Sequence, residues 1–117
     1  MLKKVNRLKK HYQYAYVYRA GHRVSGKCVS IFACTSKTKN IKIGFSVTKK
    51  VGKAVKRNKA RRRLREIIKK QLPNLKQNYN IIIVAKDNIL DFSFKEIEMD
   101  IAYLLNKLQL VIDEKSI

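Results

Sequence analysis

Apolar residues along the chain follow two different periods, and each period predicts its own kind of secondary structure. Residues 41–48 alternate strictly between apolar side chains and small or polar ones, as in a strand with one buried face. Residues 27–34 are also rich in strand-forming residues, and we expect these two segments to form an antiparallel pair. Residues 81–85 are apolar without alternation, which indicates a central strand covered on both faces.

Two later segments have the period of an amphipathic helix. The first begins near Ala54 and ends at or before Pro73. Its apolar stripe consists of Ala60, Leu64, Ile67 and Ile68. The second begins where Ser93 and Glu96 have the spacing of a capping box. Its apolar stripe consists of Ile97, Ile101, Leu104, Leu105 and Leu108.

The aromatic segment near the N-terminus fits either a strand or a helix. Its alternating tyrosines, which favour a strand, are Tyr12, Tyr14, Tyr16 and Tyr18. However, Tyr14, Val17 and Tyr18 also fall at positions i, i+3 and i+4 of a short helix. Gly21 would end that helix at the C′ position, where a left-handed glycine is common. We favour the helix.

The predicted elements indicate an α+β fold. Their order is αβββαβα, with one of the first three strands not assigned to a definite segment, and it suggests a two-layer sandwich. The length suits one domain over residues 1–117, with a basic lead at 1–10 and a short tail at 111–117. The sequence has no apolar run long enough for a membrane helix and no signal-peptide pattern at its start, so we expect a cytoplasmic protein.

Charge changes this picture more than any motif does. The chain has 28 Lys and Arg against 8 Asp and Glu, a formal net charge of +20. Residues 1–65 contain 21 of the basic residues and no acid, while residues 66–117 contain the other seven basic residues and all eight acids. A small domain with this excess repels itself unless a polyanion neutralises it. Nucleic acid is therefore the expected partner.

The sequence offers no evident catalytic or metal site. Nucleases built from protein alone usually need carboxylates to hold Mg²⁺ or to act as bases, and the acid-free part lacks them. The remaining acids, such as Asp87, Asp91 and Asp100, show no paired spacing. Cys28 and Cys34 lie too far apart along one strand for a disulfide, so we expect reduced and buried thiols. His11 and His22 complete no zinc-binding pattern, and we expect no metal on the chain.

Residues 49–70 are the strongest candidate for nucleic-acid contact, with twelve Lys or Arg and one acid. Mixed charges on a helix usually form a solvated face, but a run of nearly one sign destabilises the helix unless phosphates lie against it. In the predicted helix, Arg57 and Arg61 lie near the apolar stripe, at the rim toward the sheet. The side opposite the stripe carries Asn58, Lys59, Arg62, Arg63, Arg65, Lys69 and Lys70.

The four alternating tyrosines and Phe32 form a second candidate, which has two explanations. Unpaired bases stack on aromatic rings while nearby cations hold the phosphates. Aromatic residues at regular spacing are also typical core residues, and a chain without Trp needs their volume for packing. The sequence leaves both explanations open for each ring.

The segment IKIGFSVTKKVGKAVKRNKARRRLREI closely resembles the signature of the bacterial ribonuclease P protein subunit. Its so-called RNR stretch corresponds here to Arg57, Asn58 and Lys59, with Lys59 in place of a second Arg. NRLKK at 6–10, the aromatic segment, KCVSIFA and IIIVAK follow in the family's order, so the resemblance covers residues 3 to about 110. Tyr14 and Tyr18 replace the Phe that is frequent in the family.

The resemblance implies a fold, an activity and partners. The basic helix would connect two parallel strands by a left-handed crossover. The activity would be endonucleolytic removal of the 5′ leader from precursor tRNA by a holoenzyme whose catalytic RNA subunit holds the Mg²⁺. Contacts with that RNA subunit would come from Lys49, Lys50, Lys53, Arg57, Asn58, Lys59, Arg62 and Arg63. The cleft for the single-stranded leader would be lined by Tyr14, Tyr18, Phe32, Ser46, Arg61 and Arg65.

Two other classes of protein share parts of this pattern. A ribosomal or ribosome-assembly protein would have the same charge and an α+β fold, and would co-purify with ribosomes instead of one catalytic RNA. A stand-alone nuclease would cleave precursor tRNA without an RNA subunit, which the shortage of carboxylates argues against.

Overall fold

The computed structural model describes residues 6–112, so residues 1–5 of the expected lead and 113–117 of the expected tail lie outside the described part. The α-helices within it are α1 (His11–Ala20), α2 (Ala54–Gln71) and α3 (Phe94–Lys107). The strands are β1 (His22–Ser25), β2 (Val29–Thr35), β3 (Lys42–Ser46) and β4 (Tyr79–Ala85). Short 3₁₀ turns occupy Lys49–Val51, Leu72–Asn74 and Ile89–Asp91. The predicted order αβββαβα is confirmed, with β1 as the strand that the sequence left unassigned.

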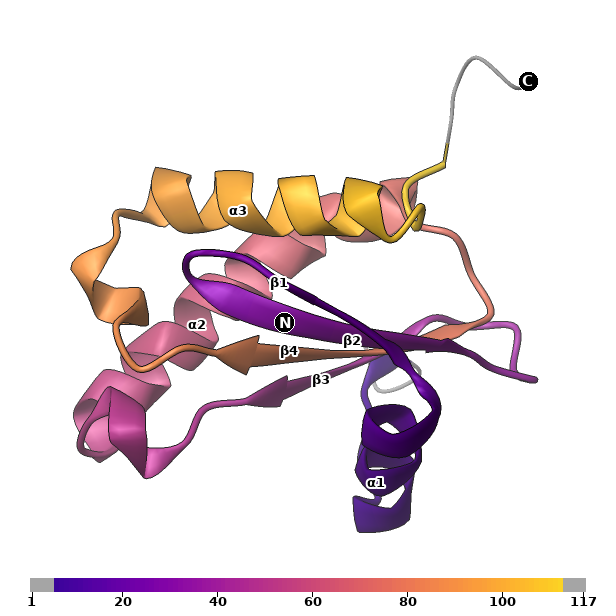
Figure 1. Cartoon of the computed structure of the whole chain (residues 1–117), viewed down its shortest axis with the longest axis horizontal. Helices are drawn as coiled ribbons and strands as arrows, with labels where there is room; N and C mark the ends of the chain where they lie inside the picture. Colours follow the sequence, from indigo (N-terminus) through magenta and orange to yellow (C-terminus); the bar gives the residue numbers. More distant parts are fainter. Residues whose placement is uncertain (1–5, 113–117) are drawn as a thin grey trace.

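The strands form one mixed sheet in the order β1-β2-β4-β3 (Figure 1). β2 is antiparallel to both β1 and β4, whereas β3 is parallel to β4. The predicted pairing of residues 27–34 with 41–48 is therefore wrong, because β4 lies between the two strands. The physical reason is burial: the non-alternating run of β4 can cover both of its faces only at the centre of the sheet, and this moves β3 to the edge.

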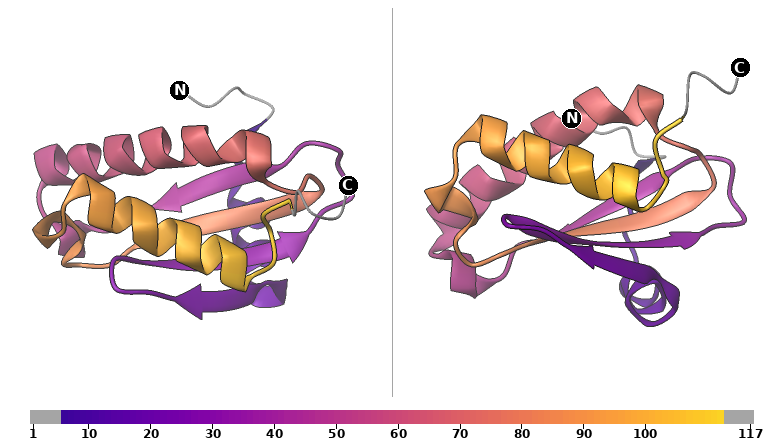
Figure 2. Two further views of the ribbon diagram at one scale, coloured as in Figure 1. Left: turned by 90° about the horizontal axis from the view of Figure 1, so that it is seen from above. Right: turned by 45° about the horizontal axis from the view of Figure 1, so that its top comes forward.

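Helix α2 connects the parallel neighbours β3 and β4. With the helices turned toward the viewer, the left panel of Figure 2 shows that this connection crosses over in the left-handed sense. About 98% of such crossovers are right-handed. The handedness agrees with the expectation from the family resemblance, and hydrophobic periodicity carries no signal for it.

Helices α2 and α3 cover one face of the sheet, and α1 lies on the other (Figures 1 and 2). The main core lies between the sheet and α2 and α3, and its largest fully buried side chains include Ile31, Leu64, Ile67, Ile81, Ile83 and Ile97. A smaller cluster under α1 consists of Leu8, Val17, Cys34 and Ile82. The two-layer sandwich thus describes the main core, and α1 adds a partial layer to the opposite face.

The start of β2 is set by a carboxylate from α3. Asp100 accepts hydrogen bonds from the backbone N–H groups of Lys27 (3.1 Å), Cys28 (2.9 Å) and Val29 (3.3 Å). Strand pairing therefore begins at Val29, two residues later than the predicted segment 27–34. A Cβ atom at Gly26 would lie 2.3 Å from the same carboxylate, so only glycine leaves room for this contact.

The favoured helix over the aromatic segment is confirmed, but its end differs from the prediction. Gly21 has an extended backbone (φ −82°, ψ 161°), not the left-handed conformation of a C′ glycine. Glycine fits there for a steric reason instead. A Cβ atom would lie 2.5 Å from the carbonyl oxygen of Val17 and 2.9 Å from that of Ala33, so Gly21 lets the chain turn tightly from α1 into β1. Across residues 6–112, none of the helices combines the length and apolar character of a membrane span.

Candidate nucleic-acid interface

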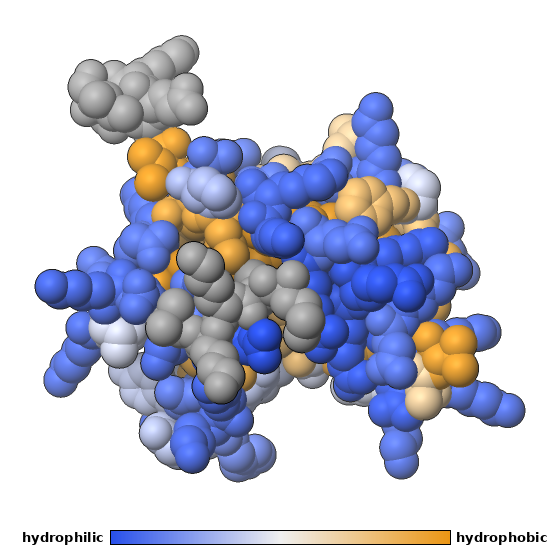
Figure 3. All heavy atoms as spheres, turned by 180° about the vertical axis from the view of Figure 1, so that it is seen from behind, coloured by the Kyte–Doolittle hydropathy of each residue, from blue (hydrophilic) through white to orange (hydrophobic). Residues whose placement is uncertain are grey.

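The outer face of α2 is a cationic surface. The helix buries the predicted stripe of Ala60, Leu64, Ile67 and Ile68 against the core. The exposed residues on and just before the helix include Lys49, Lys50, Lys53, Asn58, Lys59, Arg62 and Arg65. Figure 3, which views the molecule from the α2 side, shows hydrophilic residues over most of this face. Phosphates placed here would meet cations of one sign, because Glu66 is the only acid of α2.

Arg57 and Arg63 are less exposed than the residues of this outer face. Arg57 is half-buried, as predicted for a residue beside the apolar stripe, and its Nε atom is buried without a hydrogen-bond partner. Arg63 was expected on the outer side, but it is half-buried and donates from a guanidinium nitrogen to the carbonyl oxygen of Phe92 (3.4 Å). This hydrogen bond directs the Arg63 side chain toward the connection between β4 and α3. Arg63 therefore helps to join α2 to that connection.

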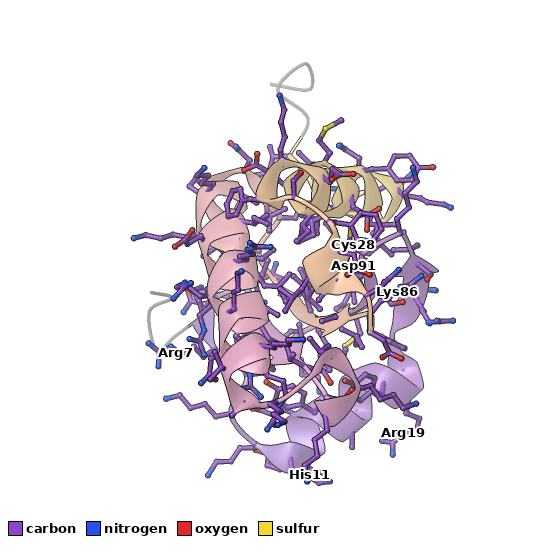
Figure 4. The ribbon with its side chains drawn as sticks, turned by 90° about the vertical axis from the view of Figure 1, so that its left-hand side faces the viewer. Arg7, His11, Arg19, Cys28, Lys86 and Asp91 are labelled. Atoms are coloured by element: carbon purple, nitrogen blue, oxygen red, sulfur yellow. The ribbon has the colours of Figure 1, made fainter. Side chains whose placement is uncertain are left out.

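A hollow of about 180 Å³ lies over the edge strand β3, between α2 and the segment that leads into α1. Its walls are formed by Arg7, Leu8, Tyr14, Ile43, Gly44, Phe45, Arg61 and Arg65. Three of these side chains are guanidinium groups and none is a carboxylate. Figure 4 shows Arg7 beside α2. Planar guanidinium forks match the geometry of phosphate oxygens, so the hollow is suited to a phosphate backbone.

Backbone packing places Arg7 and Tyr14 in this wall. Residue 7 forms a parallel bridge with Ile43, and the next N–H group, from Leu8, donates to the Ile43 carbonyl oxygen (3.1 Å). The Tyr14 ring lies directly over Gly44, where a Cβ atom would approach the Tyr14 hydroxyl oxygen to 2.5 Å. That hydroxyl donates to the carbonyl oxygen of Leu8 (3.5 Å), and burial raises its pKa.

The other predicted cleft residues lie on the sheet face that α1 partly covers. Tyr18 and Phe32 form an edge-to-face pair with ring centroids 4.9 Å apart. The guanidinium carbon of Arg23 lies 5.9 Å from the centroid of Phe32. Ser46, half-buried at the end of β3, projects to the same side as Gly44 because alternate residues of a strand share a face. Tyr18 is 39% exposed, so the pair has both a packing contact and an accessible surface.

The structure thus brings Tyr14, Arg61 and Arg65 together in one hollow, but it does not place Tyr18, Phe32 or Ser46 among that hollow's walls. Sequence reasoning missed Arg7 and Arg23 as neighbours of the two groups. The signal for Arg7 is its place in NRLKK, one of the segments that carry the family resemblance. Nothing in the local pattern could place Arg7 and Arg61 around one hollow, because that arrangement depends on which strand occupies the sheet edge.

Thiols and carboxylates form no evident reactive group in the described residues. Cys28 and Cys34 are free and buried, as expected. Burial, together with the charges of Asp100 and Glu96, raises the pKa of Cys28 to about 11, and burial raises that of Cys34. Both thiols are therefore poor nucleophiles near neutral pH. Among residues 6–112, no three His, Cys, Asp or Glu side chains gather so that they could hold a metal ion.

Comparisons with known proteins agree with this geometry. Residues 2–109 match the family described as Ribonuclease P. The chain is 36% identical over 110 residues to the ribonuclease P protein component of Alkaliphilus oremlandii, covering 94% of this chain and 96% of the relative. It is 39% identical over 101 residues to the component from Fusobacterium nucleatum, covering 83% and 91%.

A solved structure shows the same fold. The RNase P protein of Staphylococcus aureus, in a mutant form described as defective in mRNA degradation activity, superimposes with a TM-score of 0.86. The two chains are 29% identical, and the match covers 92% of this chain and 91% of the other. The family match spans most of the sequence, including the basic helix, the edge strand and the segment that lines the hollow. The chain therefore belongs to the ribonuclease P protein family.

Proposed function

We propose that this chain is the RNA-binding subunit of a ribonuclease P holoenzyme. It would assist a catalytic RNA subunit in removing the 5′ leader from precursor tRNA, which generates the mature 5′ end. The holoenzyme would act in the cytoplasm. In this proposal no side chain of the protein performs the cleavage, and the protein's contribution is binding and positioning.

The observation that carries the proposal is the hollow over β3. Arg7, Arg61 and Arg65 surround it without a carboxylate, and Tyr14 forms part of its wall. This combination suits a single-stranded RNA, whose phosphates pair with guanidinium groups while an unpaired base contacts the aromatic ring. The leader of a precursor tRNA is such a strand, so we assign the hollow and the nearby Tyr18–Phe32 pair to leader binding.

The outer face of α2, apart from Arg65, is assigned to the RNA subunit. Its exposed cations lie on a rigid helix beside the hollow, so one face can hold the catalytic RNA while the neighbouring hollow holds the substrate. Asn58 links the two regions, because its side-chain oxygen accepts a hydrogen bond from the Arg61 guanidinium (3.2 Å). We give Arg63 a smaller part in RNA binding than the sequence suggested, because its guanidinium already donates to the Phe92 carbonyl.

Mg²⁺ enters the proposal as an ion held by the RNA subunit. The residues described on this chain do not provide a donor set for it. The protein would lower the Mg²⁺ concentration that cleavage requires, because its cations reduce the repulsion between the two RNA molecules. This benefit is expected to be largest at low Mg²⁺ and smallest at high ionic strength.

The test is cleavage of a 5′-extended precursor tRNA across a Mg²⁺ series, with RNA subunit alone, protein alone and both together. The two RNA-containing curves should converge at high Mg²⁺, and protein alone should be inactive. Loss of cleavage in a folded variant that lacks one carboxylate would contradict the positioning role. Co-purification with ribosomes instead of one catalytic RNA would favour a ribosomal protein.

The leader site is tested with Arg61→Ala/Arg65→Ala. This variant should bind precursor tRNA more weakly while its affinity for mature tRNA changes little. Lys95→Ala/Lys107→Ala removes the same number of cations from α3 and serves as the matched control. Equal losses for precursor and mature tRNA would show that the two arginines supply only general charge.

A further inference from the structure

Two adjoining hollows lie on the flank of α1 that is turned away from Tyr14 and Tyr18. The first, of about 480 Å³, lies between the segment leading into α1 and the loop joining β2 to β3. The second, of about 440 Å³, lies beside α1 over the start of β4. Tyr12 and Gln13 line both hollows, so the two form one continuous surface depression. Neither hollow is part of the proposed leader site or of the outer face of α2.

The first hollow is cationic. Its basic side chains are Arg7, Lys9, Lys10 and Lys42, and no carboxylate lines it. The Gln13 side-chain oxygen accepts hydrogen bonds from the backbone N–H groups of Lys9 (3.1 Å) and Lys10 (3.0 Å). These bonds order the backbone of the two lysines at the first turn of α1, so both side chains extend from fixed positions beside the hollow. A cluster of positive charge on ordered backbone is suited to phosphate groups.

The second hollow is aromatic. Tyr12 and Tyr16 are one helical turn apart, with 69% and 49% of their surfaces exposed. The guanidinium carbon of Arg19 lies 5.7 Å from the ring centroid of Tyr16, and Figure 4 shows Arg19 at the α1 end of the molecule. Rings this exposed contribute little to the core, which removes the packing explanation for these two tyrosines. Exposed aromatic rings beside cations stack unpaired bases.

A polar group without a partner completes the second hollow. Asn80, near the start of β4, lines it, and the Oδ1 atom of this residue is buried without a hydrogen-bond partner. An unpaired buried amide oxygen is costly. Rotation about the last side-chain bond can turn either the oxygen or the nitrogen toward the hollow, and the edge of a nucleobase carries the complementary donors and acceptors.

We propose that these hollows form a second site for unpaired RNA on this protein. Arg7 lines both the cationic hollow and the hollow over β3, which connects the new site to the proposed leader site. Phosphates occupy the cationic hollow, one base stacks on Tyr12 or Tyr16, and the Asn80 amide binds the edge of that base. The inference rests on the proposed function, because it extends the path of a single strand that the protein is proposed to bind.

The first experiment measures binding of a labelled, unstructured single-stranded oligoribonucleotide to the full chain. Tyr12→Ala/Tyr16→Ala should weaken binding about tenfold, within the range for loss of a base stack. Met99→Ala/Tyr103→Ala removes two similarly exposed side chains from α3 and should leave binding unchanged. Lys9→Ala/Lys10→Ala should weaken binding and reduce its salt dependence. Thermal melts of all variants verify that they fold.

The outcomes separate this inference from the proposed function. If the unaltered chain binds the oligonucleotide and the tyrosine variant binds equally well, the second site is refuted while the leader site stands. If the unaltered chain does not bind, the proposed function itself fails. Asn80→Ala should change the ranking of adenine, cytosine, guanine and uracil homopolymers, and an unchanged ranking would refute base reading by Asn80.

The second experiment identifies which RNA supplies the strand. Affinities of Tyr12→Ala/Tyr16→Ala are measured for precursor tRNAs with short and long leaders in complex with the RNA subunit, and for the RNA subunit alone. Loss only with long leaders assigns the site to the distal leader. Equal loss with the RNA subunit alone assigns it to an unpaired segment of that subunit. No loss in any complex would overturn the site in the holoenzyme.

Discussion

Helices α2 and α3 pack side by side on the same face of the sheet, but the sequence of α3 favours helix stability and the sequence of α2 does not. α3 begins with a complete capping box, in which the Ser93 hydroxyl accepts from the Glu96 N–H (3.1 Å) and the Glu96 carboxylate accepts from the Ser93 N–H (3.0 Å). α2 has Lys53 at its N-cap, no side-chain cap and no acid in its first turn. Cations at a helix N-terminus oppose the helix dipole.

The two helices also differ in charge. Residues 54–71 of α2 contain nine Lys or Arg and one acid, whereas residues 94–107 of α3 contain two Lys and three acids. In α2, Arg57 and Arg61 are like charges at i and i+4, as are Arg61 and Arg65, and such pairs destabilise a helix. Local interactions therefore stabilise α3 but not α2, whose stability comes from its buried stripe. The surface of α2 is best explained by the RNA it would bind.

The largest expected effect comes from the N-terminal half of α2. Arg57→Ala/Asn58→Ala/Arg62→Ala should weaken binding of the catalytic RNA by several kcal/mol, at roughly 1 to 3 kcal/mol for each good contact. The slope of log Kd against log salt should also become shallower. Affinity is measured by filter binding at several salt concentrations, with melting followed by circular dichroism.

A matched triple change on α3 tests the contrast. Lys95→Ala/Glu98→Ala/Lys107→Ala alters three charged residues of that helix and should leave RNA affinity within a factor of about two. If both triple variants lose affinity equally, the division of labour between the two helices is incorrect. If the α2 variant melts no lower than the original protein, its charges do not serve folding.

The next largest effect is on folding and involves Asp100 of α3. Asp100→Ala removes the acceptor of three backbone hydrogen bonds at the start of β2 and should lower the free energy of unfolding by about 2 to 4 kcal/mol. Glu66→Ala removes an exposed acid from α2 and should change it by less than about 0.5 kcal/mol. Urea unfolding measures both, and equal effects would show that the Asp100 contacts are unimportant.

These contrasts also explain which parts of the fold could be predicted from the sequence. The capping box, the buried stripe of α2 and the apolar run of β4 depend on neighbouring residues, and all three were predicted correctly. The pairing of β2 with β4 depends on the whole sheet. Local alternation could not show that β4, 44 residues after β2 ends, would separate β2 from β3.

In the candidate site too, local features could be predicted from the sequence and contacts between distant segments could not. The charge of α2 can be counted from the sequence, and the position of Arg61 near the stripe follows from the helical period. Tyr14 could be predicted as aromatic and helical, but its place over Gly44 depends on how α1 crosses the sheet. The bridge from residue 7 to Ile43 and the bond from Arg63 to Phe92 are likewise tertiary contacts between distant segments.

A smaller effect on stability is expected from substitutions at the N-caps of the two helices. Ser93→Ala should destabilise the protein by about 1 kcal/mol, because it removes the N-cap acceptor of α3. Lys53→Asp should stabilise the protein by about 0.5 to 1 kcal/mol, because the extended backbone at Lys53 suits a capping residue and a negative charge favours the N-terminus. The same change should weaken RNA binding.

Thermal melts and RNA affinities of both cap variants give the comparison. Greater stability with weaker RNA binding in Lys53→Asp would show that α2 gives up helix stability for contact with RNA. A cap variant of α2 that gained stability and kept full RNA affinity would remove Lys53 from the interface.

The smallest expected effect is a dependence of stability on pH at Glu96. Hydrogen bonds from the Ser93 backbone N–H and the Ser93 hydroxyl lower the pKa of this carboxyl below its usual value of 4.5. Because the folded pKa is lower than the unfolded one, the stabilisation is fully present above the unfolded pKa and is lost as pH falls through the folded pKa. Glu96→Gln keeps the side-chain length and removes the charge, so the difference in melting temperature between it and the original protein should shrink between pH 6 and pH 3. Lys53→Asp should make stability depend on pH in a similar way at α2, because the first turn of α2 contains no acidic residue. If the Glu96→Gln difference is the same at both pH values, the ionised carboxylate contributes nothing to the α3 cap, and the contrast between the two helix starts reduces to Ser93 alone.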